Sequence, residues 1–407
     1  MRIAHLTATF PPYQGGAGTT TLHLARGLAA RGHTVDVLTA AADGAAPPAE
    51  AGGARVRRLR PLLAVGNAPL LPGLARTGAY DVVHLHHPFL FGTELVLTSR
   101  LRGARPALVV SYHNRLVGEG ARAPIFRAWE ETFERWLLAA ADRVCVLSAE
   151  HADSVPGLRR LSRRRPDAVE ELPNGVDLER FHPGTAAPEV RGALGIPEGA
   201  VVAAFVATLD RAHYFKRLDR AVAALSLAGD ERLHLLVVGG GEDLERQRAA
   251  VAAAGLGGRV HFAGPAGHDR LPELLRACDL LLLASDPPES FGIVLIEAMA
   301  SGLPTVATDL PGVSSVGRVG ETGLVTAPEA PALAGALRSM ADAEPDERRA
   351  MGLAGRALTE REYAWPRLVE HAEQIYAGAV AERTRRSDRP AATGLPPAAA
   401  DHRAEGL

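Results

Sequence analysis

Short apolar runs alternate with amphipathic stretches along most of the 407-residue chain. The apolar runs are rich in valine, leucine and alanine, and most are followed by a turn that contains glycine or proline. Such runs are typical of strands buried on both faces, and the stretches between them have the periodicity of helices. This repeated alternation predicts parallel, doubly wound sheets of the α/β class.

The first half of the chain predicts one Rossmann-like domain, residues 1–173. Its expected strands are residues 2–9, 34–40, 54–60, 81–87, 107–112 and 143–147. Helices are expected between them, notably at residues 19–30 and, as one amphipathic helix, at residues 124–141. The Pro-Asn-Gly turn signal within residues 172–177 ends this domain.

The second half predicts another Rossmann-like domain, residues 174–365. Its expected strands are residues 201–208, 233–238, 260–264 and 278–285. Pro366 should kink the last helical stretch or restart it, which leaves a final helix of about residues 366–381. Residues 382–407 contain almost no large apolar side chain, a composition that predicts a disordered tail.

The most informative stretch is residues 284–301, ASDPPESFGIVLIEAMAS, which follows the buried strand at 278–285. A helix from about Phe291 to Ser301 is apolar on nearly every side except at Glu297. A carboxylate there is costly unless a ligand hydroxyl binds it. Glu289 lies in the turn before the helix, so the two glutamates bracket the helix N-terminus. Its free N–H groups, on Gly292, Ile293 and Val294, predict an anion site.

These residues resemble a known family. Glu289-Ser-Phe-Gly-Ile-Val-Leu-Ile-Glu297, with the trailing Glu-Ala-Met-Ala-Ser-Gly-Leu-Pro, is similar to the signature of the retaining glycosyltransferases of family 4. The resemblance extends over about residues 1 to 380. It implies the GT-B fold, in which two Rossmann-like domains face each other across a cleft, and a final helix that crosses back to the first domain. It also implies that Glu289 holds the donor sugar and Glu297 the ribose. The alternative is a core helix whose one glutamate turns to solvent.

A second motif concerns the diphosphate of the donor. The family has Gly-Arg-Leu followed by Lys-Gly, whereas this chain has Ala207 and Thr208 at the Gly-Arg position and Arg217 in place of the last Gly. The resemblance implies that Lys216, the only lysine of the chain, grips the diphosphate. We expect Arg211 to replace the missing arginine. Two cations would stabilise the charge that develops on the leaving diphosphate, and the chain has no magnesium motif to do so.

Glycines follow the first expected strand in PPYQGGAGTT. Gly15, Gly16 and Gly18 do not form the dinucleotide fingerprint, so no NAD site is expected. They resemble the glycine-rich first loop of GT-B enzymes, which implies that Gly15 and Gly16 approach the donor diphosphate and the acceptor. The alternative is a turn that only lets a helix pack closely on a strand.

Histidines lie at the carboxyl ends of two expected strands, where ligands bind in doubly wound sheets. His86 and His87 end one strand and His113 follows the next. No cysteine or carboxylate accompanies them at metal-ligand spacing, so we expect no metal. The resemblance implies that His113 lies beside the transferred sugar and the acceptor, with His86 on the acceptor side. The alternative for His113 is an ordinary hydrogen-bonded loop histidine.

Composition narrows the class of protein. Hydrophobic residues make up 47% and charged residues 23% of the chain, as in globular proteins, and a net charge of −2 excludes general attraction to nucleic acid. No apolar run is long enough to cross a bilayer, which predicts a cytoplasmic protein. Cys145 and Cys278 lie in expected buried strands, so we expect free thiols rather than a disulfide.

The resemblance implies a retaining glycosyltransferase that moves a hexosyl group from a UDP- or GDP-sugar to a hydroxyl acceptor, which is lipid-linked, a polysaccharide or a small molecule. No cofactor is expected. The catalytic residues would be His113, Arg211, Lys216 and Glu289. The donor-binding residues would be Gly16, Arg211, Lys216, Gly264, Glu289, Phe291, Gly292, Ile293, Val294 and Glu297. The rival hypotheses are a non-catalytic nucleotide-sugar or membrane-binding module and a GT-B phosphorylase or epimerase.

A basic run in the first domain adds one hypothesis about location. Arginines crowd residues 157–166, GLRRLSRRRP. Basic residues near an anionic bilayer each contribute about 1 kcal/mol, so this run predicts weak peripheral contact with the inner face of the membrane. The alternative is a solvated helix face.

Overall fold

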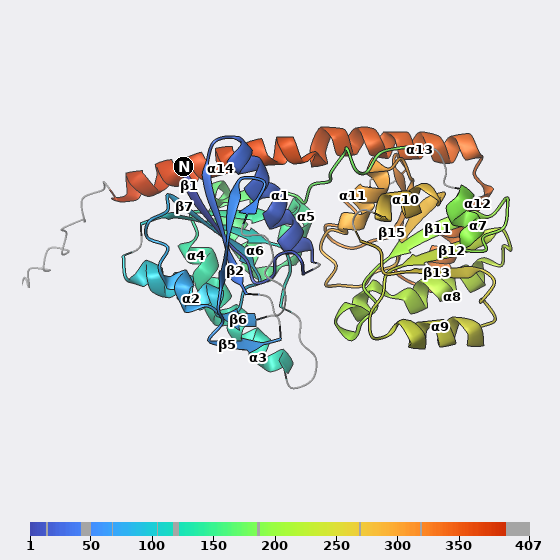
Figure 1. Cartoon of the computed structure of the whole chain (residues 1–407), viewed down its shortest axis with the longest axis horizontal. Coiled ribbons are helices and arrows are strands. Elements are labelled where there is room, and N and C mark those ends of the chain that lie inside the picture. Colours follow the sequence, from blue (N-terminus) through green and yellow to red (C-terminus); the bar gives the residue numbers. More distant parts are fainter. Residues whose placement is uncertain are drawn as a thin grey trace, which may run out of the picture.

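The computed structural model describes residues 1–387 except 14, 42–49, 67, 104, 117–121, 185–187, 268–269 and 318–319. Two α/β domains lie side by side, each built around its own sheet (Figure 1). Four clusters of buried side chains fill the two faces of these sheets. The GT-B architecture expected from the sequence is therefore present.

The first sheet has the order β10-β9-β8-β7-β1-β2-β4-β3 and is parallel except for β3 against β4. Its strands are β1 (Arg2–Leu6), β2 (Thr34–Ala40), β3 (Glu50–Ala51), β4 (Ala54–Leu59), β7 (Val82–His87), β8 (Ala107–Tyr112), β9 (Arg143–Val146) and β10 (Val169–Glu171). β5 (Leu63–Val65) and β6 (Ala68–Leu70) form a separate hairpin. The helices of this half are α1 (Gly16–Ala30), α2 (Gly92–Leu101), α3 (Arg122–Trp129), α4 (Arg135–Ala140), α5 (Ala149–Ser154) and α6 (Pro156–Arg164).

The second sheet is parallel throughout, with the order β13-β12-β11-β14-β15-β16. Its strands are β11 (Val201–Val206), β12 (Leu233–Val238), β13 (Val260–Gly264), β14 (Leu280–Leu283), β15 (Thr305–Thr308) and β16 (Gly323–Thr326). Its helices are α7 (Pro188–Ala193), α8 (Leu218–Ala228), α9 (Leu244–Ala253), α10 (Leu271–Arg276), α11 (Ile293–Ala300), α12 (Ala330–Asp342) and α13 (Pro345–Leu358).

The last helix, α14 (Trp365–Ser387), returns to the first domain and packs against α1 and β8. Figure 1 shows α13 above the second domain and α14 above the first. Val176, just after the Pro-Asn-Gly turn, forms a parallel bridge with Ala364, so the two crossings between domains lie side by side. The crossing helix and the restart near Pro366 agree with the sequence-based expectation.

Several strand and helix boundaries differ from the predictions, and three of these differences concern helices of the first domain and the crossing helix. α1 begins at Gly16 rather than at residue 19, because Gly15 is extended and the glycines after it already adopt the helical turn. The helix expected at 124–141 is interrupted by a π-helical turn between α3 and α4. Residues 382–387, expected to be disordered, continue α14, where Glu382 pairs with Arg143; residues 388–407 lie outside the described part.

Candidate functional site

The order of each sheet determines where a ligand can bind. β1 lies between β2 and β7, and β11 lies between β12 and β14, so the direction of winding reverses beside β1 and beside β11. Loops that leave neighbouring strands in opposite directions open a crevice at the carboxyl ends of the strands. The glycine loop follows β1, His86 and His87 end β7, Lys216 follows β11 and Glu289 follows β14, whereas His113 follows β8, one strand further from β1.

Lys216 and Glu289 meet at the second of these points. The Nζ atom of Lys216 lies 2.5 Å from Oε2 of Glu289, and Ser285 Oγ donates to the same oxygen at 3.2 Å. The side chains are only 20% and 10% exposed, so this pair is largely desolvated. Two residues 73 positions apart are thus joined, and the one lysine of the chain is held beside the first glutamate of the motif.

Gly292 positions the N-terminus of α11. It caps the helix with φ 76° and ψ 71°, a left-handed conformation that side chains other than glycine rarely adopt. A Cβ there would also lie 2.9 Å from the Leu283 side chain. No side chain of the described residues caps this helix, so the first N–H groups, including those of Ile293 and Val294, keep their capacity to bind an anion.

Glu297 lies in the second turn of α11 and is buried, with 8% of its surface exposed. Burial raises the pKa of its carboxyl group to about 8, against the opposing positive charges of Lys216 and Arg180. Within the described chain its carboxylate has no hydrogen-bond donor. A buried carboxyl group that protein groups leave unbonded is costly, and hydroxyl groups of a ligand would offset that cost.

The motif also contacts the first domain. The hydroxyl group of Ser290 is a hydrogen-bond donor to the first domain. Its Oγ atom lies 2.7 Å from the carbonyl oxygen of His113 and 2.6 Å from Oδ1 of Asn114. A Cβ on Gly16 would lie 3.0 Å from Cδ1 of Ile293. The glycine loop and the end of β8 therefore face the start of α11. The sequence singled out the Ser-Phe-Gly triplet but did not show that Ser290 joins the domains, because no local signal marks a contact across 176 residues.

The glycines of the first loop have different surroundings. A Cβ on Gly18 would lie 2.9 Å from the carbonyl oxygen of Thr9, so Gly18 allows α1 to pack against the backbone after β1. Gly15 is extended at the helix start, and Gly16 faces the second domain. Gly18 therefore serves close packing of α1, while Gly16 lies close to the start of α11 in the second domain.

His113 and His86 are buried at the carboxyl ends of β8 and β7, with His113 Nε2 2.9 Å from His86 Nδ1. Burial lowers the pKa of His113 to about 4, so its imidazole is neutral at physiological pH. His86 Nε2 in turn lies 3.0 Å from Nδ1 of His5. His86 is thus hydrogen-bonded at both ring nitrogens, which leaves neither of them free to bind a ligand.

His5, His84 and His86 are the described histidines whose ring nitrogens lie close enough together to consider a metal. The ring of His86 stacks on both of the others, 4.4 Å from His84 and 5.3 Å from His5 with an inclination of 25° in each case, while His5 and His84 are tilted by 43°. The in-plane lone pairs of stacked rings do not converge, and both nitrogens of His84 already bond Tyr376 and Ser111. This geometry does not fit a tetrahedral metal site.

Arg211 is not brought to the pair of Lys216 and Glu289. Its side chain is 88% exposed and lies 3.7 Å from Glu242. Arg217 occupies the family's glycine position with φ 57°, and Asp219 and Asp286 hold its guanidinium at 2.8 and 2.6 Å. These carboxylates offset the cost of a left-handed arginine, an arrangement that the sequence did not predict.

Two further residues, Gly264 and Phe291, are also expected to bind the sugar-nucleotide donor. Gly264 ends β13 in a left-handed conformation, and its carbonyl oxygen accepts from the N–H of Gly239 at 2.9 Å, at the edge of the sheet next to β12. The side chain of Phe291 is buried against the ring of Tyr363 at a centroid distance of 5.8 Å. Phe291 therefore supports the turn, and only its backbone can face a donor at α11.

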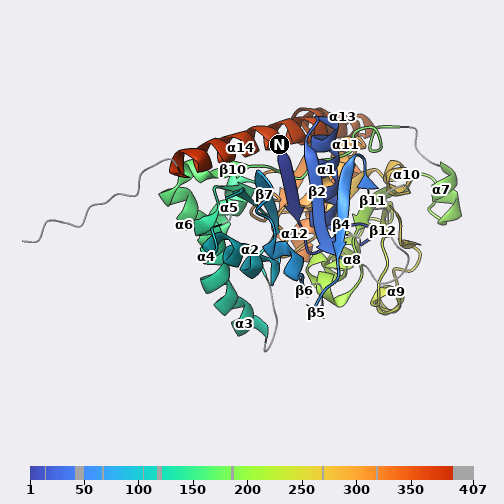
Figure 2. The same cartoon turned by 60° about the vertical axis from the view of Figure 1, so that its left-hand side comes forward.

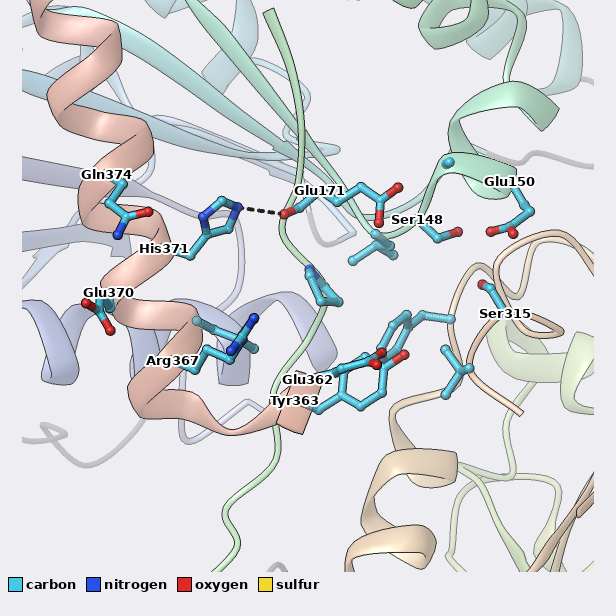
Figure 3. A pocket seen from close by; sticks show the side chains of 16 residues that line it. Ser148, Glu150, Glu171, Ser315, Glu362, Tyr363, Arg367, Glu370, His371 and Gln374 are labelled. Carbon is cyan, nitrogen blue, oxygen red and sulfur yellow. Dashed lines mark hydrogen bonds between the residues drawn. The ribbon is translucent and has the colours of Figure 1, made fainter. Parts of the chain in front are cut away.

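A cavity of about 750 Å³ lies on the other side of Phe291. Figure 3 shows Ser148 and Glu150 from the first domain, Ser315 from the second, and Arg367, His371 and Gln374 on α14. His371 Nε2 lies 3.1 Å from the carbonyl oxygen of Glu171, close to the crossing between domains. Lys216, Glu289 and Glu297 do not line this cavity, so it is separate from the residues that the sequence predicts to bind the donor.

Comparison with known proteins agrees with the geometry. The family described as "Glycosyltransferase Family 4" matches residues 14–180, and "Glycosyl transferases group 1" matches residues 187–358. D-inositol 3-phosphate glycosyltransferase from Nocardia farcinica is 35% identical over 90% of this chain and 86% of its own length. D-inositol 3-phosphate glycosyltransferase 1 from Catenulispora acidiphila is 32% identical, over 90% and 91%.

Solved structures extend the comparison. Sucrose-phosphate synthase from Thermosynechococcus elongatus superimposes with a TM-score of 0.76 at 25% identity, over 94% of this chain and 99% of that one. HepE from Anabaena, solved in complex with UDP, has a TM-score of 0.73 at 21% identity, over 93% and 100%, a likeness of fold. The chain belongs to the group 1 glycosyltransferases of family 4, and it is a GT-B glycosyltransferase that uses nucleotide-sugar donors.

Proposed function

We propose that this enzyme transfers a hexosyl group from a UDP- or GDP-sugar to a hydroxyl acceptor with retention of anomeric configuration. The observation that carries the proposal is the pairing of Lys216 with Glu289 at 2.5 Å beside the uncapped N-terminus of α11. The ammonium group of Lys216 and the free N–H groups of α11 match the diphosphate of a nucleotide sugar. The carboxylates of Glu289 and Glu297 match its sugar and its ribose.

Each part of the donor has a group that fits it. The diphosphate would take the N–H groups of Gly292, Ile293 and Val294 and the ammonium of Lys216. Glu289, released from Lys216, would accept hydrogen bonds from the sugar. Glu297 would accept from the ribose hydroxyls, and the base would lie toward Gly264. Gly16 faces Ile293 and leaves room for the diphosphate between the domains.

The bond changes need no separate strong base. The bond between the anomeric carbon and the diphosphate oxygen breaks while the acceptor oxygen attacks from the same face. The acceptor proton moves to the leaving phosphate oxygen, and Lys216 with the helix N–H groups stabilises the negative charge that develops there. No metal ion is required, because these groups fill the role that a divalent cation has in other phosphate-leaving reactions.

The acceptor would lie against the first domain, beside Gly15, Gly16 and His113, with His86 behind His113. The relatives named D-inositol 3-phosphate glycosyltransferase make D-inositol 3-phosphate the first acceptor to test. The backbone carbonyl oxygen of His113, at the carboxyl end of β8, accepts a hydrogen bond from Ser290 of the second domain, and this contact supports a role for His113 between the donor and the acceptor.

A donor screen tests the proposal. Melting temperatures are measured with UDP-, GDP-, ADP- and dTDP-sugars for the wild type and for Glu297→Ala and Glu289→Ala. A ligand at 100 times its Kd adds roughly 2.7 kcal/mol to stability, so one nucleotide class should raise the melting temperature clearly. Glu297→Ala should reduce that shift, and Glu289→Ala should mainly lower turnover. Wild-type transfer rates in both variants would show that the donor assignment is wrong.

A further proposal concerns where the acceptor is presented. On α6, Arg159, Arg160, Arg163 and Arg164 are exposed while Leu158 and Leu161 are buried. Figure 2 shows α6, α4 and α3 along one flank of the first domain, and Trp136 of α4 is 60% exposed there. We propose that this flank docks on anionic lipid when the acceptor is lipid-linked. None of the described helices is both long and apolar enough to cross a bilayer.

A further inference from the structure

Three imidazoles form a hydrogen-bonded row inside the first domain. His5 on β1, His86 on β7 and His113 after β8 come from three adjacent strands. Nδ1 of His5 lies 3.0 Å from Nε2 of His86, and Nδ1 of His86 lies 2.9 Å from Nε2 of His113. All three side chains are at most 5% exposed. The row therefore runs from the interior of the sheet to the crevice between the domains.

Each ring in this row carries one hydrogen. Burial lowers the pKa of His5 to about 3 and that of His113 to about 4, and it also lowers the pKa of His86. A neutral imidazole has one N–H donor and one bare nitrogen acceptor. Because each hydrogen bond in the row needs one donor and one acceptor, only two arrangements of hydrogens are allowed. Either every N–H points toward His113, or every N–H points toward His5.

The far end of the row distinguishes the two arrangements. Nε2 of His5 is fully buried and has no hydrogen-bond partner among the described residues. If the N–H groups pointed toward His5, this atom would be a buried donor without an acceptor. Orphaned buried N–H groups are rarer and more costly than a lone pair left unused. The favoured arrangement therefore leaves Nε2 of His5 bare and places its hydrogen on Nδ1.

This arrangement also determines which ring nitrogen of His113 carries its hydrogen. His5 donates from Nδ1 to His86, and His86 donates from Nδ1 to Nε2 of His113, so the hydrogen of His113 must lie on Nδ1. That atom has no protein partner within the described chain, yet it is not among the fully buried unpaired atoms. It is therefore accessible at the end of β8, next to the contact between His113 and Ser290.

We propose that His5 and His86 are positioning residues that fix the tautomer of His113, so that His113 presents an N–H donor to the substrates. This inference rests on the proposed place of His113 beside the transferred sugar and the acceptor. In this role His113 donates a hydrogen bond to a substrate oxygen and does not act as a base, which agrees with a reaction in which the leaving phosphate takes the acceptor proton.

The neighbouring groups hold the row in place. The ring of His84 stacks on His86 with centroids 4.4 Å apart. His84 Nδ1 lies 2.6 Å from the hydroxyl of Tyr376 on α14, and Nε2 lies 2.8 Å from Oγ of Ser111. Because His84 has its own partners on both sides, it fixes the plane of His86 without entering the row.

Substitutions at His86 separate tautomer control from packing. The amide of His86→Asn occupies the position of Nδ1 and can still donate to His113, whereas the amide of His86→Gln reaches only the position of Nε2. We expect His86→Gln to lower turnover about tenfold or more, as expected for loss of the group that fixes a catalytic imidazole. His86→Asn should recover most of that loss. Donor affinity should change little in either variant.

A second histidine pair supplies the matched control. In the other domain Nδ1 of His234 lies 2.9 Å from Nε2 of His261, with both side chains buried away from the crevice. His234→Gln removes the equivalent hydrogen bond and should leave turnover unchanged. Melting temperatures of all variants show whether each one is folded at the assay temperature.

The direct readout is the tautomer of His113 by long-range ¹H–¹⁵N spectra of histidine-labelled protein, assigned by the signals lost in His113→Ala. The wild type and His86→Asn should show a hydrogen on Nδ1, and His86→Gln should lose this preference. A hydrogen on Nε2 in the wild type, or equal turnover of the Asn and Gln variants, would overturn the inference. Unchanged turnover in His113→Ala would instead contradict the proposed role of His113 itself.

Discussion

At the scale of single residues, Lys216 decides whether the donor assignment is right. In the unliganded chain Glu289 holds its ammonium, so a bound diphosphate must take over that contact. Lys216→Ala should lower kcat roughly 10- to 100-fold, corresponding to about 1–3 kcal/mol for a charged hydrogen bond. The loss should exceed the loss of donor affinity, because the charge matters most as the diphosphate leaves. Initial rates at saturating donor measure it.

Arg211→Ala is the matched control, because Arg211 lies on the same loop but is 88% exposed. Exposed ion pairs contribute about 0.2–1 kcal/mol, so turnover should change by less than about fivefold at the chemical step. A loss as large as that of Lys216→Ala would show that Arg211 turns into the site when donor binds, as its spacing in the sequence predicts.

Glu297 predicts a pH dependence of stability in the unliganded protein. Its pKa is raised to about 8 in the folded chain, so between the ordinary value near 4.5 and about 8 the folded state binds more protons than the unfolded state. The free energy of unfolding should therefore fall as pH rises through this window, by at most about 1.4 kcal/mol per pH unit.

Denaturant unfolding of the wild type and of Glu297→Gln from pH 5 to pH 8.5 measures this term as a difference. The amide cannot ionise, so the variant should lack the decrease. Histidines with lowered pKa contribute equally to both proteins and cancel. Parallel curves for the two proteins would mean that Glu297 ionises normally in the folded chain.

Sequence patterns could single out those candidate site residues that a short motif marks. Glu289, Glu297 and Lys216 follow from motif spacing and from an isolated charge in an apolar helix. The hydrogen bond from Ser290 to His113 and the row from His5 to His113 could not be predicted, because they depend on how distant strands pair and on how the domains meet.

At the scale of elements, Arg217 shows how the loop before α8 is held. It adopts φ 57° at the position of the last glycine in the family motif, and Asp219 and Asp286 bind its guanidinium. Arg217→Ala loses both contacts and keeps the unfavourable conformation, whereas Arg217→Gly loses the contacts but not the freedom to adopt that conformation. The glycine variant should therefore be more stable than the alanine variant by about 1 kcal/mol.

Urea unfolding of the two variants measures that difference. Equal stability, or a more stable alanine variant, would mean that the loop changes its conformation once the arginine is removed. Because Lys216 immediately precedes this residue, the donor affinity of both variants should fall together with the order of the loop.

Element prediction succeeded where hydrophobic periodicity is strong and failed where packing decides. The central strands and the crossing helix are present as expected. The π-helical turn between α3 and α4 and the extension of α14 over residues 382–387 are not visible in periodicity. In the second case glutamate and arginine favour a helix, and the pairing of Glu382 with Arg143 anchors it.

For the molecule as a whole, the exposed arginines on the flank that carries α6 lead us to expect salt-sensitive binding to anionic vesicles. Arg165 does not belong to the exposed set, because its guanidinium donates to the carbonyl oxygens of Ala139 and Ala141. Changing Arg159, Arg160, Arg163 and Arg164 to serine should remove roughly 4 kcal/mol of attraction and abolish co-sedimentation at low salt.

Arg246 and Arg248 on α9 supply the control, since they are exposed arginines of the second domain. Their change to serine should leave vesicle binding as in the wild type. Binding that ignores salt, or that survives loss of the four α6 arginines, would favour an acceptor free in solution and a solvated face for α6.

The account as a whole rests on glycosyl transfer across the crevice between the two domains. The most direct measurement is an NMR assay that follows nucleoside diphosphate release and the anomeric configuration of the product together. It uses the donor found by thermal shift and D-inositol 3-phosphate or another hydroxyl acceptor. We expect diphosphate only when acceptor is present, and a new glycosidic bond with the configuration of the donor. Release without acceptor, a sugar phosphate product, or an inverted glycosidic bond would contradict the account.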